Sequence, residues 1–286
     1  DKLEKDGKWK NLSGLNYTNY HDKDEFLELI KANKLEAPSV IIHLGACTDT
    51  TEADEAFMIR NNTLYSKYVF DYCVQNDCRL IYASSAATYG SGENGYNDTE
   101  EDLNPLNCYG YSKHLFDSWV RKSENKPKQW VGLKFFNVYG PNESHKGKMA
   151  SMIYQCYRQA KGKGEVRLFK SSNAKYENGQ EKRDFIYIKD IVKIILFFLG
   201  NENQSGIYNA GTGKARTFLD LASIVFKALN KEARITFFDM PNEIKGKYQY
   251  FSEADISSMK KAGYKNSFYE SEHGIEDYIT NHLRQD

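Results

Sequence analysis

The sequence lacks three features, and each absence argues against a class of protein. Lys plus Arg and Asp plus Glu number 39 each, so no net charge draws the chain to nucleic acid or to an anionic membrane. The most apolar run, residues 191–199, is too short to span a bilayer and is interrupted by Lys193. Cysteines are few, odd in number and without metal-type pairs: Cys47, Cys73, Cys78, Cys108 and Cys156. Because the first residues are charged and show no signal-peptide pattern, we expect a cytoplasmic protein with reduced thiols and no metal.

Strand and helix patterns alternate along the chain, which indicates an α/β protein. Residues 39–46, 79–83 and 131–136 are continuous apolar runs, typical of parallel strands that are buried on both faces. Segments with helical periodicity separate them, so we expect right-handed crossover connections. Four side chains are predicted to begin helices as N-caps: Asp22, Asn107, Asp190 and Thr217.

Three predicted strands end in residues suited to a ligand site. Ligands of open parallel sheets bind beyond the carboxyl ends of the strands. Residues 45–47 (Gly-Ala-Cys) close the first, and their small side chains let a flat cofactor approach the backbone. Ser84 and Ser85 close the second, and residues 137–141 (Asn-Val-Tyr-Gly-Pro) close the third. Each end alone is also explained as a tight turn, so the prediction depends on all three occurring together.

Tyr109 and Lys113 lie four residues apart at the start of a predicted helix, so both side chains are on one face. A free tyrosine phenol ionises near pH ~10, too high for an efficient base at neutral pH. A nearby ammonium favours the phenolate and is expected to lower the pKa of Tyr109. Ser85 can then hold a substrate hydroxyl while Tyr109 takes or returns its proton. Because Tyr157 and Lys161 share the spacing, the prediction depends on the serine-terminated strand upstream and not on spacing alone.

These segments resemble the extended short-chain dehydrogenase/reductases that act on nucleotide sugars, most closely the branch that epimerises ADP-linked heptoses. The resemblance runs from residue 1 to the C-terminus. The matching segments are 44–47, 82–90, 105–107, 109–113, 137–141, 145–147, 183–188, 247–249 and 262–264. The resemblance implies a Rossmann-type doubly wound parallel sheet with a smaller mixed α/β lobe. Residues 1–137, completed by about 184–214, would bind the dinucleotide, and residues 138–286 would mainly bind the substrate.

The resemblance also implies a reaction. C6 of the heptose in ADP-glycero-manno-heptose would be inverted through transient oxidation to a ketone and return of the hydride to the other face. NADP is the implied cofactor, with NAD as second choice. The product would serve the inner core of lipopolysaccharide, and the expected assembly is a homo-oligomer, a pentamer.

The site residues follow from the same resemblance, position by position. Tyr109 and Lys146 are expected to act on opposite faces of the sugar, with Ser85 polarising the oxygen and Lys113 holding the nicotinamide ribose. The expected cofactor contacts are Asp1, Lys2, Lys8, Lys23, Leu44, Gly45, Ala46, Cys47, Thr48, Asn61, Lys113, Val138 and Lys146. The expected substrate contacts are Ser85, Asn137, Lys148, Gln155, Phe169, Lys170, Ser171, Ser172, Arg183 and Tyr248.

The sequence departs from the family pattern in two respects. The Gly-x-x-Gly-x-x-Gly turn that holds the cofactor pyrophosphate does not occur, so we expect the sequence to lack about 30 residues or more of an opening βαβ unit. Lys148 and Gln155 stand where close relatives have a Ser and a His, and residues 170–172 replace a more acidic turn. These replacements leave the exact sugar open.

Two rival functions remain open at this point. A UDP-sugar 4-epimerase or 4,6-dehydratase would share the fold, but a dehydratase needs an Asp-Glu pair at the serine turn, where residues 84–88 read Ser-Ser-Ala-Ala-Thr. A catalytically silent scaffold would explain the missing glycine turn. Against it, Ser85, Tyr109 and Lys113 are all present.

Overall fold

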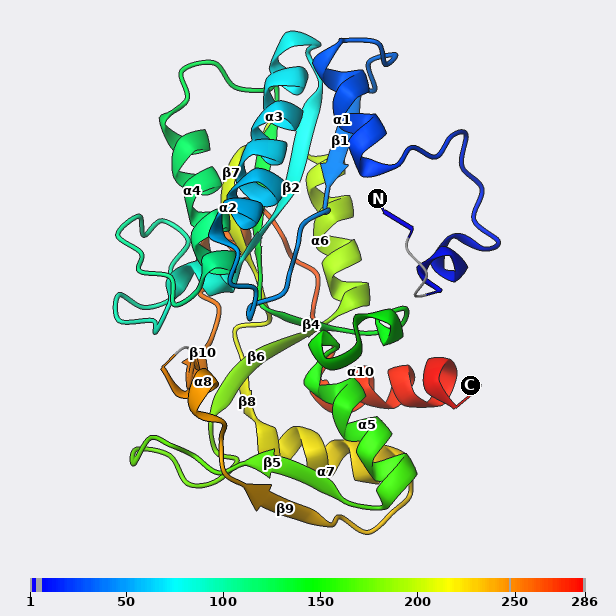
Figure 1. The fold of residues 1–286 in the computed structure, drawn as a ribbon, viewed down its shortest axis with the longest axis vertical. Coiled ribbons are helices and arrows are strands. Elements are labelled where there is room, and N and C mark those ends of the chain that lie inside the picture. Colours follow the sequence, from blue (N-terminus) through cyan, green and yellow to red (C-terminus); the bar gives the residue numbers. More distant parts are fainter. Residues whose placement is uncertain (1, 4–6, 247, 285–286) are drawn as a thin grey trace.

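The structure is a computed structural model, and it describes residues 2–3, 7–246 and 248–284. Its larger lobe is built on a four-stranded parallel sheet in the order β1-β2-β3-β7 (Figure 1). The strands are β1 (Val40–His43), β2 (Arg79–Ser85), β3 (Trp130–Phe135) and β7 (Gly206–Ala210). Because all four run in the same direction, their carboxyl ends open on one edge of the sheet.

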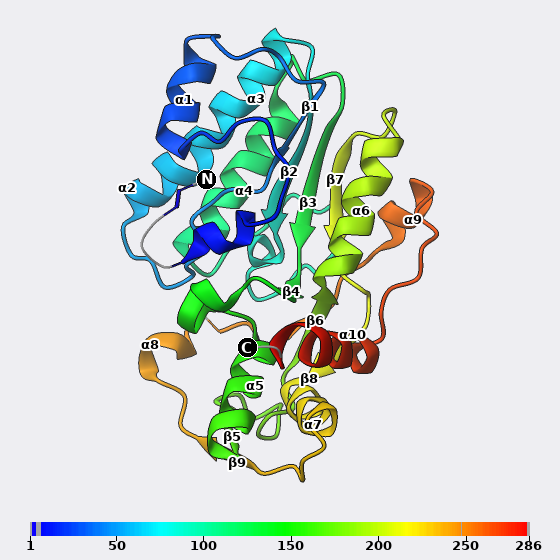
Figure 2. The same ribbon diagram turned by 90° about the vertical axis from the view of Figure 1, so that its right-hand side faces the viewer.

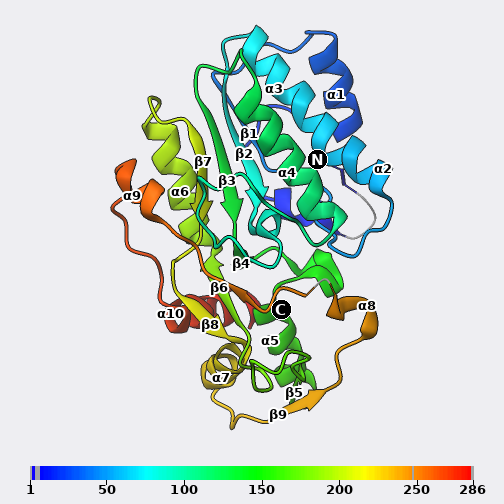
Figure 3. The same ribbon diagram turned by 90° about the vertical axis from the view of Figure 1, so that its left-hand side faces the viewer.

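Helices cover both faces of this sheet, as Figures 2 and 3 show from opposite sides. One face carries α1 (Lys23–Lys31), α2 (Glu55–Met58), α3 (Tyr65–Gln75) and α4 (Cys108–Lys122), and the other carries α6 (Ile188–Gly200) and α9 (Ser257–Lys261). Successive side chains of β2 pack alternately against the two helical layers. Leu80 and Tyr82 pack with α3 and α4, whereas Ile81 packs with α6. Burial on both faces explains the continuous apolar runs of the sequence, and the predicted α/β class is confirmed.

The smaller lobe contains two further sheets (Figure 1). In one sheet, β4 (Asn137–Tyr139) and β10 (Phe251–Ser252) flank β6 (Lys182–Tyr187), and β8 (Ala215–Thr217) adds an antiparallel strand. In the other, β5 (Val166–Phe169) pairs with β9 (Ile235–Phe238). The helices of this lobe are α5 (Met152–Lys163), α7 (Phe218–Ala228), α8 (Asn242–Lys245) and α10 (Ser271–Tyr278). The chain returns to the larger lobe through α6 and β7, and the assignment of the lobes to cofactor and substrate stays a prediction.

Side-chain caps explain where several helices begin. Asp22, Asn107 and Thr217 each accept a hydrogen bond from a backbone amide of the following turn, at 2.8 to 2.9 Å, so these three predicted N-caps are confirmed. The prediction for Asp190 is wrong, because α6 already begins at Ile188. Asp190 lies in its first turn, where the buried carboxylate accepts instead from the amide of Tyr269 at 2.7 Å.

Shorter helical turns complete the fold. They are 3-10 turns at Lys8–Leu12, Ala86–Tyr89 and Ser144–Met149 and π-helical turns at Ile59–Leu64 and Ile279–Leu283. Within the described residues, no helix has the length and apolar character needed to cross a membrane. The same part of the chain holds no group of three or more His, Cys, Asp or Glu residues that could bind a metal ion. All five cysteines are free thiols.

Candidate active site

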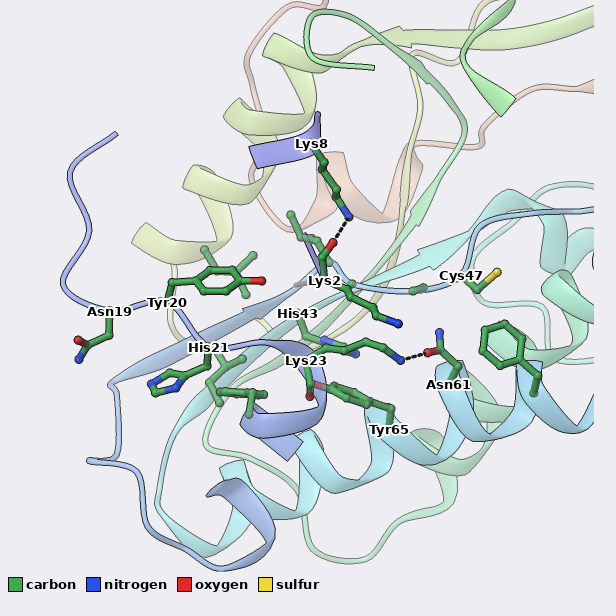
Figure 4. A pocket seen from close by; sticks show the side chains of 17 residues that line it. Lys2, Lys8, Asn19, Tyr20, His21, Lys23, His43, Cys47, Asn61 and Tyr65 are labelled. Carbon is green, nitrogen blue, oxygen red and sulfur yellow. Dashed lines mark hydrogen bonds between the residues drawn. The ribbon is translucent and has the colours of Figure 1, made fainter. Parts of the chain in front are cut away.

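A cavity of about 920 Å³ lies beside the carboxyl end of β1 (Figure 4). The strand end contributes small and apolar groups to its wall, and the N-terminal segment, α1 and the π-helical turn contribute polar ones. Eight of the predicted cofactor contacts line it: Lys2, Lys8, Lys23, Leu44, Gly45, Ala46, Cys47 and Asn61. Outside this lining are Thr48, Lys113, Val138 and Lys146. Asp1, the remaining predicted contact, lies outside the residues that the structure describes.

The residues around this cavity fit a nucleotide cofactor. A Cβ added at Gly45 would meet no atom within 4 Å, so the backbone is open there to a flat ring. Ile42 and Leu44 are 40% and 47% exposed beside it, although residues of a parallel sheet are normally covered on both faces. Lys23 donates from Nζ to Oδ1 of Asn61 at 2.7 Å, which places an ammonium group at the cavity wall (Figure 4). Apolar surface for a ring and cations for phosphates are thus present together.

The end of the next strand brings the three predicted chemical groups together. Ser85 ends β2, and its hydroxyl oxygen accepts from the amide of Ala87 at 3.1 Å, which caps the following 3-10 turn. Tyr109 lies in the first turn of α4, partly buried, and its phenol interacts with the Ser85 side chain. Lys113, one helical turn further on, donates to the carbonyl oxygen of Ala83 at 2.8 Å. Serine, phenol and ammonium therefore meet at the end of β2.

The pKa directions in this group differ from the expectation. Burial raises the pKa of the Tyr109 phenol, and hydrogen bonding with Ser85 opposes this without cancelling it. Burial also lowers the pKa of Lys113 to about 8, although the charge of Asp117 acts in the opposite direction. The net shift of the phenol pKa in the protein is therefore upward, the opposite of the expectation. The expected lowering of the phenol pKa is therefore wrong for the protein itself, because burial disfavours the charged form of both groups.

Lys146 lies on the 3-10 turn that follows β4, and its side chain is exposed. The buried carboxylate of Glu143 anchors this turn at its start. It accepts from the amide and hydroxyl of Ser151, at 2.6 and 2.7 Å, and from the hydroxyl of Tyr278 at 3.0 Å. The loop that presents Lys146 is thus fixed to the beginning of α5 and to α10, while the lysine itself remains accessible.

The next residues of this loop include two predicted substrate contacts. Gly147 has φ 56° and ψ −121°, a conformation that glycine adopts without strain, and its carbonyl oxygen accepts from Nε2 of Gln155 at 2.7 Å. The pKa of Asp49, in the segment after β1, is lowered by hydrogen bonds from Thr51 and also by the charge of Lys148. The loop therefore lies near the segment that follows β1, although whether Lys148 and Gln155 contact a substrate stays a prediction.

Arg183, Tyr248 and Phe169 form a second cluster, on the smaller lobe. The guanidinium of Arg183 lies over the Tyr248 ring, 5.2 Å from its centroid, and donates to Oε1 of Gln249 at 3.1 Å. The ring of Phe169 meets Tyr248 edge to face at 6.4 Å. Nε of Arg183 is buried without a hydrogen-bond partner. A desolvated guanidinium with an unused donor is suited to an anionic ligand.

The remaining predicted substrate contacts have local partners within the protein. Lys170 forms an ion pair with Asp239 at 3.2 Å, and the Ser171 hydroxyl donates to the carbonyl oxygen of Asn173 at 3.1 Å. Ser172 lies against Met240, with its hydroxyl 3.4 Å from the thioether sulfur. On β4, Nδ2 of Asn137 donates to the carbonyl oxygen of Asp184 at 3.0 Å. Their proposed role in substrate binding stays a prediction.

The sequence reasoning missed two sets of residues at the site. His43 lines the cavity, and burial together with the charge of Lys113 lowers its pKa to about 3. Asp117 and Lys134 form a buried ion pair beneath the serine turn, with Nζ and Oδ2 3.5 Å apart. The four-residue step from Lys113 to Asp117 was a readable signal, because it repeats the step from Tyr109 to Lys113. No sequence pattern indicated that Lys134 lies opposite Asp117.

A parallel sheet wound on both faces, with a cofactor-like cavity at one strand end and Ser, Tyr and Lys at the next, defines a Rossmann-type α/β class of protein. The model of the NAD dependent epimerase/dehydratase family matches residues 1–211. The chain belongs to that family.

Named relatives cover almost the whole chain. The ADP-L-glycero-D-manno-heptose-6-epimerase of Fusobacterium nucleatum is 46% identical over 100% of this chain and 90% of its own length. The protein of the same name from Nitratidesulfovibrio vulgaris is 43% identical over 99% of this chain and 88% of its own. Among solved structures, the Helicobacter pylori enzyme of that name has a TM-score of 0.81 at 29% identity, covering 96% of this chain and 81% of that one. A UDP-glucose 4-epimerase from Thermotoga maritima, with a TM-score of 0.77 at 19% identity over 96% of this chain and 89% of its own, shows the fold alone.

Proposed function

We propose that the protein is an NADP-dependent epimerase that inverts C6 of the heptose in ADP-glycero-manno-heptose. The observation that carries the proposal is the meeting of Ser85 and the Tyr109 phenol at the end of β2, while a lysine-lined cavity lies at the end of the neighbouring β1. The names of the relatives from F. nucleatum and N. vulgaris, at 46% and 43% identity, support the choice of substrate.

Each side chain has a separate task in this proposal. A bound nicotinamide dinucleotide supplies an acceptor and donor of hydride. Tyr109 takes the proton of the C6 hydroxyl on one face of the sugar, and Ser85 fixes the oxygen by a hydrogen bond. Lys113 holds the nicotinamide ribose and adds positive charge beside the phenol. Lys146 would exchange the proton of the oxygen when the ketone presents its other face, and the configuration at C6 changes because the hydride returns to that face.

The cavity residues support NADP over NAD as the cofactor. Lys2 and Lys8 of the N-terminal segment and Lys23 of α1 line the cavity, and their positive charge favours the extra 2′-phosphate of NADP. Residues 44–48, Asn61 and Val138 would hold the rest of the dinucleotide. NAD remains the alternative.

For the substrate, we propose that Arg183 binds the diphosphate of the ADP group. Its planar guanidinium can donate to two phosphate oxygens at once, and Tyr248 and Phe169 add ring surface beside it. The further proposed contacts are Asn137, Lys148, Gln155, Lys170, Ser171 and Ser172.

Arg183→Lys is expected to raise the KM for the ADP-sugar by roughly 10- to 100-fold while changing kcat much less, because the charge remains but the planar fork is lost. Steady-state kinetics of the two variants would measure this. The matched control is Arg167→Lys, which alters an exposed arginine that also lies over a ring, Phe238, at 4.8 Å. Equal KM values for both variants would remove Arg183 from the substrate site.

The reaction itself is tested by incubating the protein with ADP-heptose and, separately, with UDP-glucose. We expect inversion at C6 of the heptose and no change in UDP-glucose, read from the proton NMR couplings of each product. Turnover of the UDP-sugar alone would instead make the protein a 4-epimerase of the same fold. A 4,6-dehydratase is disfavoured because Ala86 and Ala87 stand where its carboxylate pair would be.

The silent scaffold differs from an epimerase in cofactor content. We expect the purified full-length protein to contain tightly bound nicotinamide nucleotide, measured by absorbance and mass spectrometry after denaturation. Protein without nucleotide and without turnover would favour the scaffold.

We further propose that the protein is cytoplasmic and forms a homo-oligomer, a pentamer. Its product would be a precursor of the lipopolysaccharide inner core.

A further inference from the structure

The helix that positions the phenol carries a third buried functional group. Tyr109, Lys113 and Asp117 follow one another at four-residue intervals on α4, so their side chains lie on one face. Asp117 is 3% exposed and Lys113 is 4% exposed. A carboxylate that is removed from water is costly unless hydrogen bonds and an opposite charge compensate it. The roles proposed above leave Asp117 without a task.

Asp117 is held by side chains of the strands beneath α4. Its carboxylate accepts from the Ser84 hydroxyl at 2.6 Å and from the Tyr82 hydroxyl at 3.1 Å. The ammonium of Lys134, which is 1% exposed, lies 3.5 Å away. Ser84 and Lys134 are direct neighbours in the register of β2 and β3, so both partners reach the carboxylate from one point of the sheet. These contacts fix Asp117 between α4 and the strands.

The same network reaches both sides of the serine turn. Lys134 also donates to the Thr88 hydroxyl at 2.6 Å, and that hydroxyl donates to the carbonyl oxygen of Ser85 at 2.8 Å. On the other side, Lys113 donates to the carbonyl oxygen of Ala83 at 2.8 Å. The backbone of the serine turn is therefore tied to Lys134, the ion-pair partner of Asp117, and to Lys113, one helical turn from it.

The carboxylate has an electrostatic effect on both lysines. Burial lowers the pKa of Lys113 to about 8, and Asp117 acts in the opposite direction. Burial likewise lowers the pKa of Lys134, and Asp117 again opposes it. A buried ion pair adds little net stability, because the loss of hydration offsets the attraction. The clearer consequence of Asp117 is the protonation of the lysine that stands beside the phenol.

We propose that Asp117 is a positioning residue of the active site, whose fixed carboxylate, one helical turn from Lys113, keeps that lysine protonated at the end of β2. An ammonium can favour the Tyr109 phenolate only while it retains its proton. Asp117 thus acts through Lys113 and not on the substrate. The protonation of Lys113 is a property of the protein itself, whereas its consequence for catalysis rests on the proposed function.

Other titratable groups interact electrostatically with Lys113 or Asp117. They are His43 of β1, Tyr82 of β2, Tyr89 after β2, Lys134 of β3, and Tyr109 and His114 of α4. Cys47, Asp98 and Arg121 act in turn on members of this group. The negative charge of Asp117 also raises the pKa of Tyr109 directly. Removing the Asp117 charge would lower the phenol pKa directly, but it would also favour loss of the Lys113 proton, which raises the phenol pKa. The effect on the Lys113 pKa has one direction only, so the titration of Lys113 is the cleaner measurement.

The test is a pH titration of the lysine side-chain NMR resonances, with Lys113 assigned by the resonance that Lys113→Met removes. In the wild-type protein the Lys113 midpoint is expected at about pH 8. Asp117→Asn should lower it by about one pH unit or more, and Asp117→Glu, which keeps the charge, should restore most of the shift. The matched control is Asp71→Asn, which removes an exposed aspartate from α3 and should leave the midpoint in place.

A folded Asp117→Asn protein with an unmoved Lys113 midpoint would overturn the proposal. If that variant does not fold, Lys134→Met provides a second test, in which the Lys113 midpoint is expected to move in the opposite direction. It removes the competing cation, so the Lys113 midpoint should rise, and an unchanged or lower midpoint would likewise overturn the proposal. In turnover assays the alkaline limb of the kcat profile should move with the NMR midpoint. Wild-type protein that does not turn over ADP-heptose would contradict the proposed function alone, because the titration needs neither substrate nor cofactor.

Discussion

Tyr109→Phe is expected to lower turnover of the ADP-sugar by roughly 10²- to 10⁴-fold, the range that a positioned acid–base group contributes. The ring and its packing remain, whereas the phenol that takes the proton of the C6 hydroxyl in the proposed scheme is removed. Cofactor affinity should change little, because Tyr109 does not line the cavity at the end of β1. The measurements are kcat by proton NMR and the dissociation constant of the dinucleotide by calorimetry.

The same helix supplies a matched control for this substitution. Tyr111 lies two residues further along α4 and is 50% exposed, so Tyr111→Phe makes the same chemical change on the same element. It should retain wild-type turnover. If Tyr109→Phe retained more than about a tenth of the wild-type rate, the phenol would not be the proton acceptor and the proposed chemistry would lose its centre.

The architecture of the sheet could be predicted because its cause is local. Continuous apolar runs indicated strands covered on both faces, and β2 and β3 are such strands, whereas Ile42 leaves β1 partly exposed. N-caps were equally readable where the capping bond closes within the next turn, as at Asn107. The N-cap prediction for Asp190 failed because its carboxylate accepts a hydrogen bond from the amide of Tyr269, which is 79 residues away in sequence. Local pattern thus fails where a distant backbone group competes for the side chain.

The chemistry of the site could be predicted only in part, for a similar reason. The step from Tyr109 to Lys113 is a helical spacing, but the charge state of Lys113 depends on desolvation and on Asp117. Asp117 in turn depends on Lys134, which reaches it through the pairing of β2 with β3. Burial and strand register are tertiary facts, and without them the sign of the pKa shift at the phenol could not be derived.

Lys146→Met is expected to lower the rate of epimerisation to roughly a hundredth of the wild-type rate or less. Oxidation of one epimer should remain. The substitution removes an exposed ammonium from the loop after β4 but does not touch Ser85 or Tyr109. In a scheme with one proton-exchanging group on each face, the Tyr109 face still forms the ketone. We expect the ketone to be trapped and identified by mass spectrometry, with no inverted product in the proton NMR spectrum.

The control for this variant is Lys128→Met, which removes an exposed lysine just before β3. Lys128 lies at the amino ends of the strands, whereas the site lies at their carboxyl ends. It should epimerise at the wild-type rate. If Lys146→Met also epimerised at that rate, both proton exchanges would have to pass through Tyr109. The ketone must present its second face to the hydride donor in either scheme, so Tyr109 would then exchange the proton in both orientations. Since Glu143 fixes the start of the loop and Lys146 itself is exposed, the kinetics of this variant decide between a second proton-exchanging group and a single phenol that serves the oxygen in both orientations of the ketone.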